Sequence, residues 1–105
     1  MTAIEILRVI HISQDRRVLA ISEYPGTASG VLIPVRAILA DLLRLHSAGL
    51  VLSHNHPSGD PTPSRADIAA THAFARVIEA LGVRLHDHLV RGSGRFVSFR
   101  ELGLL

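Results

Sequence analysis

The stretch 50–67 constrains the fold of this chain more than any other. An apolar run over 50–53 is followed by His54-Asn55-His56-Pro57 and by a loop that contains three prolines. Proline fixes φ at about −65°, so this loop has little backbone freedom. Ser64 and Asp67 then have the spacing of a helix N-cap and its third residue, which is typical of a capping box. The pattern predicts a buried strand, a rigid loop and the start of a long helix.

Hydrophobic periodicity predicts the other elements. We expect helices from Pro34 to Gly49 and from Ser64 to Gly82, and a helical turn in the tail after Arg100 that packs its leucines. The expected strands cover 6–13, 17–23, 31–33, 50–53, 84–91 and 95–99. The order β-β-β-α-β-α-β-β indicates one α/β domain with a mixed sheet and one helix on each face.

Composition excludes several classes of function. The chain has 105 residues, of which 48% are apolar, and a formal net charge of +2. Its basic side chains are all arginines, and Arg16-Arg17 is the only adjacent pair, so a strong nucleic-acid footprint is absent. A lysine nucleophile is excluded as well. Without cysteine, a signal-peptide pattern or an apolar stretch of bilayer length, the expectation is a cytoplasmic protein with no membrane partner.

His54, His56 and Asp67 form a candidate zinc site. The period of two in an extended chain puts both imidazoles on one face, and the rigid loop returns the carboxylate toward them. Two nitrogen ligands and one oxygen ligand leave a fourth position open for water, as catalytic zinc requires. Each part has a simpler structural interpretation when taken alone: Ser64-x-x-Asp67 is typical of a capping box, and a single histidine is more often a surface or hydrogen-bonded residue than a ligand. The combination favours metal binding.

The sequence SHNHPSGDPTPSRAD over 53–67 resembles the metal-binding motif of the JAB1/MPN/Mov34 (JAMM) metalloenzyme domain, most closely its RadC-like branch. The segment HDHLV over 86–90 and the pattern Ser-x-x-Glu-x-Gly-Leu-Leu over 98–105 are also similar to that branch. The resemblance covers essentially the whole chain. We therefore expect 1–105 to be a single RadC-like JAB/MPN domain that lacks the N-terminal helix-hairpin-helix segment.

The resemblance implies an α/β fold of JAMM/MPN type, with a mixed β-sheet and two main helices in a cytidine-deaminase-like architecture. It implies a Zn²⁺-dependent hydrolase of peptide or isopeptide bonds, whose partner is a peptide or protein-tail substrate. By the motif, His54, His56 and Asp67 are the metal ligands, and Ser64 is the serine near the bound water. The glutamate that the family places just before the first strand corresponds to Glu5.

In the expected mechanism, zinc lowers the pKa of water, and Glu5 accepts the proton and passes it to the leaving amine. Zinc and the Ser64 hydroxyl stabilise the oxyanion. Glu23 is the rival base, with an exposed strand-end charge as its simpler interpretation. His86 and His88 alternate with Asp87, so both imidazoles are expected on one face and Asp87 on the other. We expect ordinary hydrogen bonds for these residues, with a second metal pair or a carboxylate that orients a ligand as the alternative.

Two other functions stay open. One is a non-catalytic metal-binding interaction module that keeps the fold without the activity. The other is a DNA-repair-associated factor or metal-dependent nuclease, which would need clustered phosphate-binding cations and several carboxylates. The His-x-Glu and Pro-Cys-x-x-Cys patterns of zinc deaminases do not occur, nor does HExxH. The oligomeric state also stays open, with a homodimer as one outcome.

Overall fold

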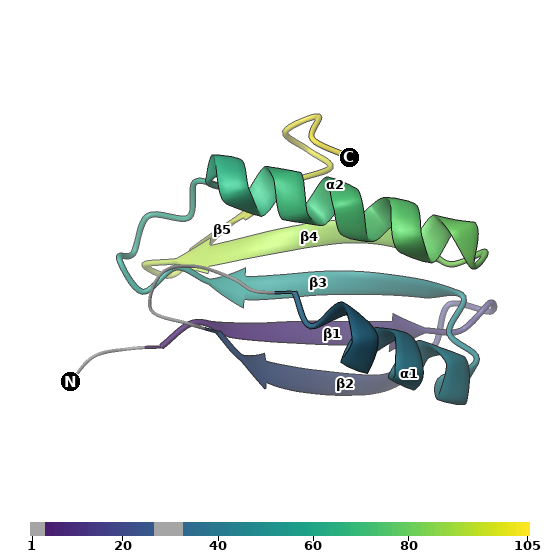
Figure 1. The fold of residues 1–105 in the computed structure, drawn as a ribbon. Coiled ribbons are helices and arrows are strands. Elements are labelled where there is room, and N and C mark those ends of the chain that lie inside the picture. Colours follow the sequence, from purple (N-terminus) through teal and green to yellow (C-terminus); the bar gives the residue numbers. More distant parts are fainter. Residues whose placement is uncertain (1–3, 27–32) are drawn as a thin grey trace.

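The computed structural model describes residues 4–26 and 33–105. In this part of the chain, five strands form one mixed sheet in the order β2-β1-β3-β4-β5. The β3–β4 pair is parallel, and the other three pairs are antiparallel. The elements are β1 (Ile6–Ile12), β2 (Val18–Pro25), α1 (Val35–Leu45), β3 (Gly49–Asn55), α2 (Arg65–Ala80), β4 (Arg84–Gly92) and β5 (Arg95–Ser98), as Figure 1 shows. The predicted α/β domain with two helices is confirmed.

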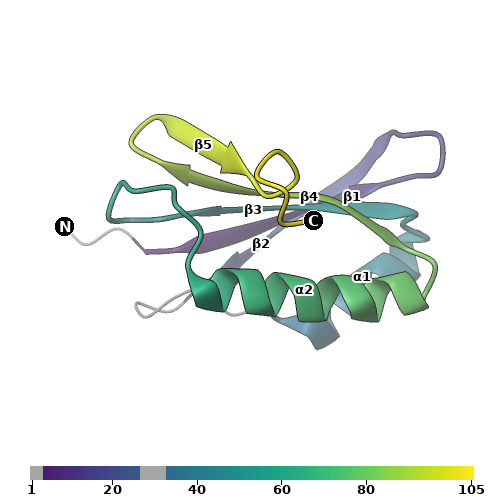
Figure 2. The same ribbon diagram turned by 90° about the horizontal axis from the view of Figure 1, so that it is seen from above.

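Both helices lie on the same face of the sheet, which corrects the prediction of one helix on each face (Figure 2). Residues of α1 and α2 share one core with alternate residues of the central strands, including Leu7, Val9, Ile38, Leu52 and Ile78. The prediction was wrong because β1 is apolar at both parities, which is typical of a strand covered on both sides. In the structure, Ile10 lies on the other face opposite Ile21, whose side chain is 58% exposed.

Two predicted element boundaries change. Helix α1 ends at Leu45, because His46 adopts a left-handed conformation with φ 55°, and Gly49 begins β3 instead of closing the helix. The strand expected over 31–33 falls mostly outside the described residues, and Ile33 itself lies in no strand and packs against the core.

Helix α2 follows its prediction closely. Ser64 is the N-cap of a complete capping box with Asp67, and Gly82, just beyond the helix, has φ 76°. The tail after Ser98 forms turns, one of them closed by a bond from the Leu102 N–H to the Ser98 carbonyl at 3.0 Å. Of the predicted packing of its leucines, Leu105 packs against the core, whereas Leu102 is exposed. Within the described residues, no helix has both the length and the apolarity that crossing a bilayer requires.

Candidate metal centre

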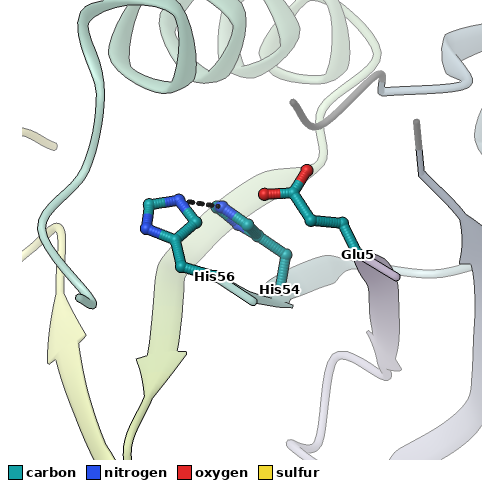
Figure 3. A group of neighbouring side chains, drawn as sticks. All are labelled: Glu5, His54 and His56. Atoms are coloured by element: carbon teal, nitrogen blue, oxygen red, sulfur yellow. Dashed lines mark hydrogen bonds between the residues drawn. The ribbon is translucent and has the colours of Figure 1, made fainter. Parts of the chain in front are cut away.

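The two imidazoles of the motif lie at the carboxyl end of β3. His54 is the penultimate residue of that strand and is fully buried, and His56 follows the strand. The backbone N–H of His56 donates to the Arg91 carbonyl at 2.7 Å, which continues the pairing with β4 for one more residue. The extended chain therefore carries both rings to the same side, where they meet the side chain of Glu5 (Figure 3).

A chain of hydrogen bonds fixes the tautomer of His54. The Thr71 hydroxyl donates its only proton to the Asp67 carbonyl at 2.6 Å, so it accepts from His88 Nδ1 at 2.7 Å. Since Nδ1 of His88 then carries the proton, its Nε2 accepts from His54 Nδ1 at 2.6 Å. The Nε2 lone pair of His54 is left free and faces His56.

His56 is held in the same tautomer by a different partner. Its Nδ1 lies 2.8 Å from the Asp60 carbonyl, which accepts only, so Nδ1 carries the proton. The two Nε2 atoms are 3.1 Å apart (Figure 3). With both tautomers fixed, two lone pairs face each other, and a shared cation is the arrangement that makes this contact favourable.

The structure places the carboxylate of Asp67 against the same point. One of its oxygens is 3.1 Å from His56 Nε2, and the other is 3.7 Å from His54 Nε2. Ligand atoms that each lie about 2.0–2.2 Å from a tetrahedral zinc ion are about 3.3–3.6 Å from one another. The two Nε2 atoms are 3.1 Å apart, and each has one oxygen of the Asp67 carboxylate within 3.7 Å, so the three side chains are close enough to share one zinc ion.

Asp67 also belongs to the capping box. Its carboxylate accepts from the Ser64 backbone N–H at 2.9 Å, and its own N–H donates to Ser64 Oγ at 3.0 Å. Burial opposes ionisation of Asp67, but the contacts of its carboxylate with the adjacent His54 ring and with Ser64 outweigh burial and lower its pKa below the ordinary value. The capping and metal-binding interpretations of this residue are therefore compatible.

The side chain of Glu5 lies beside His54, with His56 beyond that ring (Figure 3). It is 7% exposed, and among the described residues its Oε2 has no hydrogen-bond partner. Ligand atoms of Glu5, His54 and His56 all lie within 4.8 Å of one another, so this carboxylate is a second donor for the same centre (Figure 3).

The backbone around Glu5 is clamped by Asn55, a residue that the sequence analysis missed. The Asn55 carboxamide accepts from the Ile6 N–H at 2.7 Å and donates to the Ile4 carbonyl at 3.1 Å. The Glu5 carbonyl itself accepts from the Gly26 N–H at 2.7 Å. A Cβ at position 26 would lie 3.0 Å from Glu5 Cβ, so the absence of a side chain there permits this close approach. The only sequence signal for this role was the place of Asn55 between the two histidines.

The other expected residues lie as follows. Glu23, the rival base, is exposed and forms an ion pair with Arg8 at 3.2 Å on the face of the sheet opposite the helices. Ser64 is the N-cap of α2 and contacts Asp67 there. In the β3–β4 pair, Leu50 pairs with Leu85 and Val51 pairs with Asp87, so His86 is an extra residue in β4. This register shift breaks the alternation of the strand, and His86 and His88 no longer share a face. The expected pairing of His86 with His88 is therefore wrong.

Of these two histidines, only His88 contacts a side chain of the centre, through its hydrogen bond with His54. Its ring stacks on Phe99 with centroids 4.6 Å apart, and burial, reinforced by His54, lowers its pKa to about 3. A neutral His88 is what the hydrogen-bond chain from Thr71 to His54 requires. Sequence reasoning could not assign it, because the register shift that turns it toward α2 leaves no trace in the alternation of the strand.

Comparison with known proteins agrees with this geometry. Residues 1–104 match the model of a family described as the RadC-like JAB domain. The chain is 47% identical over 102 residues to a UPF0758 protein of Rhodobacter capsulatus, a match that covers 96% of this chain and 48% of that protein. For a UPF0758 protein of Roseiflexus castenholzii the values are 42% identity over 101 residues, 95% of this chain and 43% of the relative. This chain thus spans about half the length of these relatives.

Proposed function

Because the chain belongs to the RadC-like JAB domain family, we propose that it is a zinc-dependent hydrolase of peptide or isopeptide bonds. The observation that carries the proposal is the convergence of two imidazole lone pairs and a carboxylate on one point. In this proposal His54, His56 and Asp67 hold the metal, since two imidazole nitrogens and a carboxylate oxygen are the ligands of a catalytic zinc site and these side chains adjoin one another.

Glu5 takes the role of base and not of ligand in this proposal. It precedes β1, whereas His54 lies in β3 and Asp67 in α2, and its Oε2 has no other partner among the described residues. When bound, a zinc ion lowers the pKa of water and polarises a carbonyl oxygen. The Glu5 carboxylate accepts the proton of the attacking water and passes it to the leaving amine.

Ser64 stabilises the oxyanion in this proposal. Its Oγ accepts the Asp67 N–H, which leaves the hydroxyl proton free to donate. One oxyanion donor of this kind contributes about 2.7–4 kcal/mol to transition-state stabilisation. The same contact with Asp67 fixes the position of Ser64 relative to the proposed metal.

The substrate enters, in this proposal, through an opening of about 450 Å³ beside His56. Its walls include Asn55, Arg91 and the exposed aromatic ring of Phe96. An open groove with an aromatic surface and guanidinium groups suits an extended peptide segment or protein tail.

The metal assignment is tested by zinc analysis of the purified wild type beside His56→Ala, with His72→Ala as the matched control. His72 is exposed on α2 and contacts the Leu104 carbonyl. We expect about one zinc per chain in the wild type and the control, and little in His56→Ala. A folded wild type that takes up no zinc when zinc is supplied would contradict the assignment.

The catalytic assignment is tested with Glu5→Gln, using Glu23→Gln as the control on the other face of the sheet. We expect Glu5→Gln to retain zinc while cleavage of tail-fused proteins falls at least about a hundredfold. The control should keep wild-type turnover, because Glu23 is paired with Arg8 away from the centre. Equal turnover in both variants would remove Glu5 from the mechanism.

The main alternative is a non-catalytic metal-binding module. The capping box favours it, since Asp67 and Ser64 stabilise the start of α2 whether or not the chain has activity. Zinc bound at one per chain, with no cleavage of any tail-fused protein by the wild type, would support this alternative.

A further inference from the structure

A second polar opening lies at the other end of the sheet. It has a volume of about 360 Å³, and we call it the arginine cleft; it is lined by Ile12, Arg16, Arg84, His86 and Arg100. The cleft lies near the first residue of β3, and the histidines of the metal centre near its last, so six steps of about 3.3 Å separate them by roughly 20 Å. The arginine cleft is therefore distinct from the proposed active site.

The backbone shapes this cleft. At the register shift between β3 and β4, His86 is the additional residue of β4, and its ring lies over Gly49. A Cβ at position 49 would lie 2.2 Å from His86 Nε2, so only glycine admits the ring there. The Arg100 guanidinium is held in place, because it donates to the His86 carbonyl at 2.6 Å and to the Leu85 carbonyl at 3.1 Å.

The charge in the arginine cleft is uncompensated. No carboxylate lines it, and among residues 4–26 and 33–105 no ion pair involves Arg16, Arg84 or Arg100. The neighbouring Asp87 carboxylate is already bonded to the Ser98 hydroxyl and to the backbone N–H groups of His88 and Arg100. Burial lowers the pKa of His86, and the three guanidiniums lower it further.

We infer that the arginine cleft binds a phosphate monoester dianion. A carboxylate has one charge and two oxygens, which a single guanidinium fork satisfies. Three guanidiniums around one opening match the nearly double charge and the three terminal oxygens of a phosphate monoester. This binding site goes beyond the proposed hydrolase and does not depend on it.

The experiment is a titration of the 105-residue chain with inorganic phosphate at constant ionic strength, followed by NMR of the His86 ring. We expect a saturable shift in the wild type and about a tenfold loss of affinity in Arg84→Gln. Arg84 is exposed and at the start of its strand, so its removal leaves the fold intact. The matched control is Arg76→Gln on the exposed side of α2, which should bind phosphate like the wild type.

Three further probes distinguish the sources of the anion. Adenosine monophosphate should bind at least as well as phosphate, while acetate should bind far more weakly. An unphosphorylated oligothymidylate that binds more tightly than the monophosphate, with a steep salt dependence, would overturn the proposal in favour of a nucleic-acid strand. Equal affinity for acetate and phosphate, or no saturable shift of His86, would also overturn it.

Discussion

At the scale of single residues, the centre depends on side chains that set the orientation of others. Asn55 is one of them: it would not touch the metal, yet it bonds the backbone on both sides of Glu5. We expect Asn55→Ala to lower kcat about tenfold or more while zinc content stays at the wild-type level, because only the base loses its position. Asn55→Asp, which keeps the acceptor for the Ile6 N–H, should recover part of the rate. Zinc loss in the alanine variant would show a role in metal binding instead.

His88 is a second such residue, because it accepts the proton of His54 Nδ1. Loss of a hydrogen-bond partner of a metal-bound imidazole typically weakens metal affinity about 10–100-fold. We expect His88→Leu to weaken zinc binding by this factor in a competition titration with a chelator, and His88→Gln, which retains an acceptor, to weaken it less. Equal zinc affinity in all three proteins would remove His88 from the site.

At the scale of elements, the N-terminus of α2 serves both fold and site. Ser64 caps the helix, and loss of such a cap costs about 1 kcal/mol. We expect Ser64→Ala to lower the free energy of unfolding of metal-free protein by about this amount in urea. Ser64→Asn, which keeps a capping oxygen, should be close to the wild type. If the alanine variant is as stable as the wild type, the hydrogen bond from the Ser64 backbone N–H to the Asp67 carboxylate is enough to cap the helix.

The elements also show what sequence could and could not predict. The proline loop, Ser64 and Gly82 act through local backbone geometry, so both ends of α2 followed from the sequence. The placement of both helices on one face of the sheet could not be predicted. Strand β1 has apolar residues on both of its faces, so only tertiary packing decides which face is covered. The support of His54 by His88 depends on a register shift between strands distant in sequence, which no local pattern encodes.

At the scale of the whole molecule, buried histidines make stability depend on pH. His11 is fully buried with Nδ1 2.8 Å from Ser47 Oγ, and burial lowers its pKa. The unfolded chain therefore binds a proton more readily than the folded one, so this stability is complete above about pH 6.5 and is lost as pH falls below it. If a histidine stays neutral in the folded chain, its protonation in the unfolded chain lowers the free energy of unfolding by at most about 2 kcal/mol between pH 6.5 and pH 5.

We expect His11→Leu to unfold in urea with a shallower decline of stability between pH 7 and pH 5 than the wild type. The effects of the other titrating groups, including His88, are shared by both proteins and cancel in the comparison. Parallel stability curves would show that His11 is protonated equally in the folded and unfolded chains.

The proposed ligands all lie within residues 54–67, whereas the proposed base belongs to the segment that leads into β1. In the proposed function, metal binding and proton transfer therefore depend on different parts of the chain. On warming, displacement of Glu5 alone, ahead of β1, would remove the proposed base while the proposed ligands keep their places. Such a protein would have two thermal limits, a lower one for turnover and a higher one for zinc release.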